Sequence, residues 1–530
     1  MERDEGRYAA VAQEMLDRGD PITPRFNGVV YLDKPPLLHW LTAASFACLG
    51  RTELAARLPT ALGAVVCTLI TYLFGARVLG PRTACLAAAI LASSLLWWGM
   101  ARYLRFDMLL SLAVAASLWW AWLAVEEPER GRGLFVLAAA AAAVGVLLKG
   151  PIALVLPGLT FLAYLACTRR LHVVLRVPWL ACLGAMALIV VPWFWACERL
   201  NPGATRFFLL HENIQRLAGT TDPGHLQAWW FLIASLLAGV FPWTLASMGA
   251  LGSAVTEARR GEPEARRAAL FLLLWVGATI VVYSASRVKF PHYVLPALPP
   301  LALLIGRHAA RPEGRWSLAV TGLFVAVVGV SLPFFAPNLL EKAHVPSEPF
   351  VGAIAVCGVG LGLAAAVAAV RRRPGVSVAA VAVWGLATWH GAYWALDHGN
   401  SALTSKPLAE AVAGLLRPGE EVIAYGYLPR GLVFYLDRRI PVVGGTPAEY
   451  DFVGNRGRLA AAVIPLAQAH ATFGHAPGRL GVSRDHDWAA VQAAARGHLR
   501  LLQRCGRYVI FRTEPAPPDD VTHPRPQPTG

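Results

Sequence analysis

The sequence predicts a polytopic α-helical membrane protein that ends in a small α/β domain. Of its 530 residues, 56% are hydrophobic and only 15% are charged, which lies outside the usual composition of soluble domains. Apolar stretches of about 20 residues, the length needed to cross a bilayer, recur between residues 58 and 394. The formal net charge of +15 comes from Lys and Arg in short loops between these stretches, where membrane orientation explains them better than a nucleic-acid partner does.

About twelve membrane spans are expected from these stretches. They cover residues 58–78, 82–100, 108–125, 133–148, 152–166, 177–196, 229–248, 268–286, 293–305, 316–336, 351–370 and 377–396. Every second connecting loop is rich in arginine, for example "EARRGEPEARR" and "RRRPG", and these loops are predicted to be cytoplasmic. The opposite loops then face outside, including residues 1–57, which no span precedes. A first helix upstream of Met1 is therefore expected, which brings the number of spans to about thirteen.

Four regions are predicted along the chain. Residues 1–57 form an external loop in which "RYAAVAQEMLDRG" and "KPPLLHWLTAASFACLG" are helices at the membrane interface. Residues 58–397 form the transmembrane bundle. Residues 404–514 form an extracytoplasmic α/β domain with a helix at "KPLAEAVAGLLRPGE" and strands at "EVIAYGY" and "GRYVIFRTE". Residues 515–530 are rich in proline, cannot pack a core and are expected to be disordered.

Charged residues at the edge of a membrane are costly, so their placement indicates a functional site. The predicted external loops supply carboxylates, cations and histidines together. These residues are Asp4, Glu5, Asp33, Asp107 and Glu212, then Arg7, Lys34, Arg105, Lys149, Arg216 and Lys289, and finally His211, His225 and His292. Cations hold a phosphate by charge-assisted hydrogen bonds, and a carboxylate can take a proton from an attacking hydroxyl. The mixture suits a phosphorylated lipid that reacts with a neutral nucleophile.

Each of these groups also has an ordinary structural explanation. The acidic pair in "DEGRYA" suits the N-terminus of any helix, and "YLDKPP" suits a capped helix start with a lysine at the membrane edge. Lys149 in "LLKGP" could anchor a helix that ends at Gly-Pro, and "HENIQR" could be a solvated helix face. Taken singly, none of these motifs identifies a site.

The order of the motifs is more specific than any one of them. From Asp4 to Gly306 the chain contains "DEGRYAAVAQEMLDRGD", "PRFNGVVYLDKPPLLHW", "RFDMLL", "LLKGP", "FFLLHENIQRLAG" and "VKFPHYVLPALPPLALL". In this order the motifs resemble the bacterial membrane glycosyltransferases of the GT-C class that use polyprenyl-phosphate sugars. The resemblance is greatest to the lipid A aminoarabinose transferase group and its relatives of the dolichyl-phosphate-mannose-protein mannosyltransferase type. It implies a GT-C-like helix bundle.

The resemblance also implies roles for individual residues. Asp4 would be the catalytic carboxylate that deprotonates or orients the acceptor hydroxyl, with Glu5 and Asp107 in support. The cations that would bind the donor phosphate are Arg7, Lys34, Lys149 and Arg216. The metal site of the family would fall at Asp33, His211 and Glu212, although this sequence has Asp for the usual Glu and "HEN" for "EH". No cofactor is required, and a divalent Zn²⁺, Mg²⁺ or Mn²⁺ ion stays open.

The implied reaction moves a sugar from undecaprenyl phosphate to a hydroxyl or phosphate acceptor at the cytoplasmic membrane, with the active site on the periplasmic side. The acceptor would be a glycolipid such as lipid A or another envelope glycan, with a protein hydroxyl as the alternative. The chain has no G-x-G-x-x-G in a strand-to-helix setting and no G-x-x-x-x-G-K-[ST], so a nucleotide-sugar donor is not predicted. Two other classes stay open, namely a transporter or flippase for lipid-linked sugars and a catalytically silent binding protein.

Overall fold

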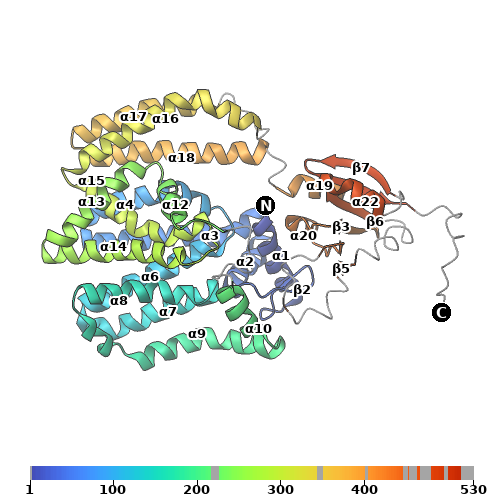
Figure 1. Ribbon diagram of the computed structural model, residues 1–530, viewed down its shortest axis with the longest axis horizontal. Helices are drawn as coiled ribbons and strands as arrows, with labels where there is room; N and C mark the ends of the chain where they lie inside the picture. Colours follow the sequence, from blue (N-terminus) through green and yellow to red (C-terminus); the bar gives the residue numbers. More distant parts are fainter. Residues whose placement is uncertain are drawn as a thin grey trace, which may run out of the picture. The chain divides into compact units, whose positions relative to one another are not determined.

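The computed structural model describes residues 3–215, 226–342, 350–399, 404–445, 452, 462–465, 479–494 and 499–514. The chain divides into two compact units. The first, Asp33–Asn400, is a helix bundle, and the second combines Met1–Leu32 with Ser401–Gly530 and contains the main sheet (Figure 1). Contacts therefore group the first 32 residues with the C-terminal part of the chain, and not with the rest of the predicted external loop.

The helix bundle contains eight helices long and apolar enough to cross a bilayer, counted over the described residues. They are α3 (Glu53–Leu79), α6 (Phe106–Glu126), α7 (Gly131–Lys149), α9 (Trp179–Leu200), α14 (Pro263–Ser284), α16 (Gly314–Lys342), α17 (Phe350–Val370) and α18 (Pro374–Gly399). The pair α12 (Phe231–Gly239) and α13 (Thr244–Arg260), bent by 112°, makes a ninth if it is one broken span. The protein is thus a polytopic helical membrane protein, with fewer long spans than the sequence predicts.

The difference in number arises from short or broken helices. Helices α4 (Pro81–Ser93), α8 (Ile152–Cys167) and α15 (Leu298–Ala310) have 13, 16 and 13 residues. A helix of 13 residues rises only about 20 Å, whereas the hydrocarbon core of a bilayer is about 30 Å thick. The predicted span at residues 82–100 is interrupted at Ser94, whose extended backbone separates α4 from α5 (Leu95–Met100). Apolar composition continues through such breaks, so it overestimates the number of long spans.

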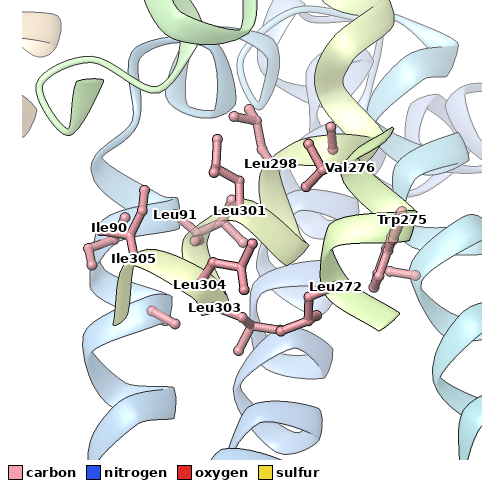
Figure 2. Packing of buried hydrophobic residues seen from close by; sticks show 14 of the residues in the cluster. Ile90, Leu91, Leu272, Trp275, Val276, Leu298, Leu301, Leu303, Leu304 and Ile305 are labelled. Carbon is pink, nitrogen blue, oxygen red and sulfur yellow. The ribbon is translucent and has the colours of Figure 1, made fainter. Parts of the chain in front are cut away.

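The core of the bundle is built around α15. This helix carries apolar residues on most of its faces, and such a helix is stable in a bundle when other helices enclose it. Figure 2 shows Leu301 and Leu304 of α15 in one buried cluster with Ile90 of α4 and with Leu272 and Trp275 of α14, and α15 contacts both of these helices. All five side chains are almost completely buried. The short preceding 3₁₀ helix η5 (Pro291–Ala297) is held at the same place because it continues directly into α15.

The candidate spans differ widely in the fraction of their apolar window that is buried inside the protein. In α6, 78% of the apolar window is buried inside the protein, whereas in α9 only 17% is buried. Helix α6 therefore lies in the interior of the bundle, and α9 leaves most of its apolar surface for lipid. Helices α16, α17 and α18 pack on one another as a separate layer of the bundle (Figure 1).

The second unit contains a six-stranded mixed sheet with the order β5-β4-β3-β6-β8-β7. The strands are β3 (Glu421–Tyr425), β4 (Val442–Val443), β5 (Val463–Ile464), β6 (Arg479–Arg484), β7 (Leu499–Cys505) and β8 (Tyr508–Thr513). Strand β3 is parallel to β4 and β6, β5 is parallel to β4, and β8 is antiparallel to β6 and β7. The predicted helix α19 (Lys406–Leu415) and strands β3 and β8 are confirmed. Ile423, Val443, Val509 and Phe511 form the core of the sheet.

The N-terminal segment is part of this second unit. Helix α1 (Arg3–Arg18) packs against α20 (Arg430–Leu436) and against β1 (Arg25–Phe26), which pairs with β2 (Val29–Val30). Asn27 and Gly28 form the turn of this hairpin with φ of 56° and 85°, as a tight two-residue turn requires. The Asn27 side chain donates to the carbonyl of Ile440 and accepts from its N–H, both at 2.8 Å. The apolar face of α1 is therefore covered by protein, where the sequence predicts a helix at the membrane interface.

Candidate functional site

The helix bundle brings together two charged residues that the sequence places 42 positions apart. Asp107 lies in the first turn of α6, and Lys149 is the last residue of α7, positions where helix dipoles favour these charges. The ammonium of Lys149 donates to Oδ1 of Asp107. The two side chains are only 14% and 5% exposed, so the pair is well shielded from water.

Two more basic side chains face the other carboxylate oxygen of Asp107. Nε of Arg105 lies 3.7 Å from Oδ2, and Nε2 of His292, from η5, lies 3.6 Å from it. Three loops that the sequence places on the same side of the membrane, "RFD", "LLKGP" and "KFPHY", thus meet at one carboxylate. Asp107 is the carboxylate around which Lys149, Arg105 and His292 are arranged.

A pair of tyrosines lines the same site. The rings of Tyr283, in α14, and Tyr293, in η5, stack with centroids 4.6 Å apart. The Lys149 ammonium lies 4.4 Å from the Tyr293 ring centroid and 5.7 Å from that of Tyr283. Such contacts with the faces of aromatic rings stabilise a cation. The buried hydroxyl of Tyr283 has no hydrogen-bond partner among the described residues, so it is able to donate to a bound ligand.

Lys34 adds a third cation to this cluster. Its ammonium donates to Glu212 Oε2 at 3.0 Å and to the carbonyl of Asp33 at 2.7 Å. The charges of Lys34 and Arg105 both act on the ammonium of Lys149. Among the described residues, Lys34, Arg105 and Lys149 therefore bring three cations to this end of the bundle, where their side chains are largely shielded from water. Such a concentration of cations suits the binding of an anion.

The chain turns at Gly150, directly after Lys149, and at this turn the end of α7 packs closely against the π-helical segment η3 (Phe207–Gln215). Gly150 has a φ of 89°, a region open almost only to glycine, and its Cα faces Phe208 of η3. A Cβ atom at this position would lie 2.6 Å from Cζ of Phe208. Glycine therefore allows η3, which carries Glu212, to pack directly on the end of α7.

Replacement of Gly150 by alanine is expected to destabilise the protein more than the matched change Gly80→Ala. Gly80 has a nearly equal φ of 91° but no heavy atom within 4 Å of the added Cβ. Backbone strain costs about 1–3 kcal/mol at either position, and only Gly150→Ala adds the collision with Phe208. Thermal unfolding of the two variants measures the difference. Equal losses would show that the contact with η3 contributes nothing.

A separate charged cluster lies in the second unit, at the start of α1. Arg7 donates to Oδ1 of Asp4 at 3.1 Å, one helical turn away, and to the hydroxyl of Tyr8 at 3.3 Å. Its guanidinium also lies 5.3 Å from the centroid of the Tyr31 ring. Asp4 is 24% exposed and Glu5 is buried. The "DEGRYA" motif thus forms an organised, partly accessible carboxylate site.

The residues predicted for a metal site have other contacts. Glu212 is paired with Lys34, and the ring of His211 stacks on Phe207 with centroids 4.8 Å apart. Within the described residues, no three side chains from His, Cys, Asp and Glu come together as metal ligands. Arg216, predicted to bind the donor phosphate, and His225 lie outside the described residues.

Four residues of the bundle site have no role assigned from the sequence: Arg105 and His292, which are among the candidate charged residues, and Tyr283 and Tyr293, which the structure adds. Three of them stand in or beside motifs that the sequence singles out, "RFDMLL" and "VKFPHYVLP". Tyr283 is preceded by an ordinary apolar stretch, and no local signal marks it. Lys289, also among the candidate cations, instead donates to the carbonyl of Gln227 at 3.0 Å, and burial lowers its pKa.

A polytopic helix bundle with a cationic cluster at the ends of its helices and an attached α/β unit is the architecture expected of GT-C membrane glycosyltransferases. Residues 33–195 match the family described as dolichyl-phosphate-mannose-protein mannosyltransferase. In fold, the chain is similar to ArnT from Cupriavidus metallidurans bound to undecaprenyl phosphate. The TM-score is 0.80 and the identity 25%, over 96% of this chain and 93% of that one. The predicted resemblance to this group is confirmed.

Curated relatives agree with the structural match. The undecaprenyl phosphate-alpha-4-amino-4-deoxy-L-arabinose arabinosyl transferase 1 of Pseudomonas fluorescens is 33% identical over 330 residues, which is 62% of this chain and 56% of the relative. The corresponding transferase of Pseudomonas aeruginosa is 34% identical over 358 residues, 66% of this chain and 63% of the relative. The matched part of the chain thus spans somewhat more than half the length of these relatives.

Proposed function

We propose that this protein is a glycosyltransferase that moves a sugar from undecaprenyl phosphate to a glycolipid such as lipid A or to another envelope glycan. The observation that carries the proposal is the shielded cluster of Lys34, Arg105 and Lys149 in an ArnT-like bundle. Such a cluster suits the phosphate of a lipid-linked donor. The names of the relatives support undecaprenyl phosphate as the lipid and an aminopentose as the sugar.

The proposed reaction forms a bond between an acceptor oxygen and the anomeric carbon of the sugar. The bond from that carbon to the phosphate oxygen breaks, and its electron pair stays on the lipid phosphate. Lys34, Lys149 and Arg105 stabilise the charge that develops there, assisted by Arg216 and by the hydroxyl of Tyr283. Asp4 takes the proton of a hydroxyl acceptor, or orients a phosphate acceptor that has no proton to lose.

The contacts of Asp107 and Arg7 change the roles that we propose for these two residues. Asp107 accepts a hydrogen bond from Lys149, so we assign it to the donor side as the group that positions this lysine. Arg7 donates to Asp4, so we assign it to the acceptor side with Asp4 and Glu5. The resemblance alone implies the opposite for each. Asp33, His211 and Glu212 keep no proposed metal role, since Glu212 holds Lys34 instead.

The proposed topology places the reaction on the extracytoplasmic face of the cytoplasmic membrane. Helices α4, α8 and α15 and the bent pair α12–α13 then cross together with the eight long helices, which gives twelve spans in all. The short helix α15 is enclosed by longer neighbours, so it need not match the full bilayer thickness by itself. Arginine-rich loops such as "RRRPG" then face the cytoplasm.

Transfer in lipid vesicles tests the proposal. Full-length protein is mixed with undecaprenyl phosphate carrying a labelled aminoarabinose or mannose, and with lipid A or a serine-containing peptide as acceptor. We expect labelled lipid A, and inhibition of its formation by free undecaprenyl phosphate. Labelled peptide would instead support a protein mannosyltransferase. Movement of the labelled donor between leaflets, with no product on either acceptor, would overturn the proposal in favour of a flippase.

A further inference from the structure

Helices α1 and α20 approach each other backbone to backbone in the second unit. A Cβ atom on Gly6 would lie 2.4 Å from Cα and 2.7 Å from N of Gly431, distances at which atoms overlap. Gly6 is the glycine of "DEGRYA", and Gly431 is the second residue of α20. The glycine of the N-terminal motif is therefore required by a contact with the C-terminal part of the chain.

The close approach delivers a second guanidinium to the N-terminal motif. Arg430, the first residue of α20, donates to Oδ1 of Asp4 at 3.3 Å. Arg7 donates to the same oxygen at 3.1 Å. Arg430 and Asp4 are 23% and 24% exposed, so the bond is partly shielded while the carboxylate stays accessible. Two guanidinium groups, from elements 426 residues apart, thus orient one carboxylate.

The position of α20 on α1 is secured at its other end as well. Gln13, two turns along α1 from Gly6, donates to Oδ1 of Asp437 at 2.6 Å, and Asp437 ends α20. Ile440, three residues further on, makes both backbone bonds to the side chain of Asn27. The N-terminal segment thus contacts α20 in its first turn, at Gly431, and beyond its last turn, at Asp437, so Arg430 is placed by an extended interface and not by a single flexible contact.

We propose that Arg430 is a positioning residue for Asp4, through which the C-terminal α/β region becomes a component of the catalytic machinery. This inference rests on the proposed function, in which Asp4 acts on the acceptor. Arg430 restricts the rotamers of Asp4 and directs the carboxylate toward the acceptor oxygen. The planar, forked guanidinium fixes the orientation of its partner better than the ammonium of a lysine does.

Steady-state kinetics of five variants tests the inference. We expect Arg430→Ala to lower kcat by about 100-fold, because a misplaced catalytic group is costly, while the KM for the undecaprenyl-phosphate donor changes less than about threefold. Arg430→Lys should restore part of kcat. The double variant Asp4→Asn with Arg430→Ala should be no slower than Asp4→Asn alone, since Arg430 acts through Asp4. Arg504→Ala removes an exposed arginine–aspartate pair of the same unit and should leave kcat unchanged.

The outcomes separate the inference from the proposed function. A kcat for Arg430→Ala near that of the unchanged protein, with Asp4→Asn inactive, overturns the positioning role and leaves the function standing. Additive losses in the double variant also overturn it. If Arg430→Ala melts at a much lower temperature, the Lys variant decides, because a purely structural role predicts that stability and kcat recover together while a positioning role predicts full stability with incomplete kcat. Absence of transfer by the unchanged protein overturns the proposed function itself.

Discussion

The change Asp4→Asn is expected to reduce sugar transfer by about 100- to 10,000-fold, the range that a general base contributes. Asparagine keeps the shape of the side chain and can still accept from Arg7 and Arg430, so the loss reports the missing charge and proton acceptor. Binding of undecaprenyl phosphate should change by less than about twofold, because the proposed role of Asp4 is in the reaction of the acceptor and not in binding of the donor. Both quantities are measured on full-length protein in vesicles.

Asp17→Asn provides the matched control for this change. Asp17 lies on the same helix and is exposed, so its replacement alters the charge of α1 by the same amount without touching the motif. Its transfer rate should stay close to that of the unchanged protein. Turnover of Asp4→Asn at a comparable rate would remove Asp4 from the chemistry, and equal loss in both variants would attribute the effect to the charge of the helix.

The change Lys149→Met is expected to affect stability and transfer together. Removing the ammonium leaves Asp107, which is 5% exposed, without its hydrogen-bonded cation, and breaking a buried ion pair in this way costs about 3–5 kcal/mol. In the proposed reaction the donor phosphate also loses a cation that stabilises the leaving group, which should lower the transfer rate by about 100-fold or more. Thermal unfolding and single-turnover kinetics measure the two losses separately.

A second substitution separates these two effects. In the double variant Lys149→Met with Asp107→Asn, the buried carboxylate no longer lacks its hydrogen-bonded cation, so part of the stability should return while transfer stays low. Arg77→Met is the control, because Arg77 pairs with Glu127 at an exposed place and its loss should cost at most about 1 kcal/mol. Recovery of transfer in the double variant would show that Lys149 serves only to neutralise Asp107.

Much of the bundle and its charged site could be predicted from the sequence because membrane burial leaves strong signals. Apolar stretches mark the helices, and charges such as Asp107 and Lys149 are conspicuous at their ends. Tyr283 could not be predicted in the same way, since a tyrosine near the end of an apolar helix is ordinary and its role depends on stacking with Tyr293. The interruptions at Ser94 and between α12 and α13 depend on tertiary packing, which composition does not report.

The N-terminal segment was harder to predict for a different reason. Its Asn27-Gly28 pair between apolar residues is a strong local signal for a hairpin, and it could have replaced the expectation of an interfacial loop. The partner of that hairpin lies beyond residue 400, and no local pattern connects "DEGRYA" with "PRGLVFYL". Contacts at such sequence separation follow from the fold and not from any short motif. For the same reason, the sequence does not indicate the contact of Arg430 with Asp4.

The contact of α1 with α20 sets the order in which the molecule can mature. Gln13 and Asp437 are separated by 424 residues, so α1 leaves the ribosome long before its partner helix exists. At about 5–20 residues per second, synthesis of the intervening chain takes between about 20 and 85 s. Throughout this interval the membrane helices can assemble, but the carboxylate of Asp4 lacks Arg430 and the close contact at Gly6. If Arg430 positions Asp4 as inferred, the chain reaches its full rate of transfer only after its last region has been made.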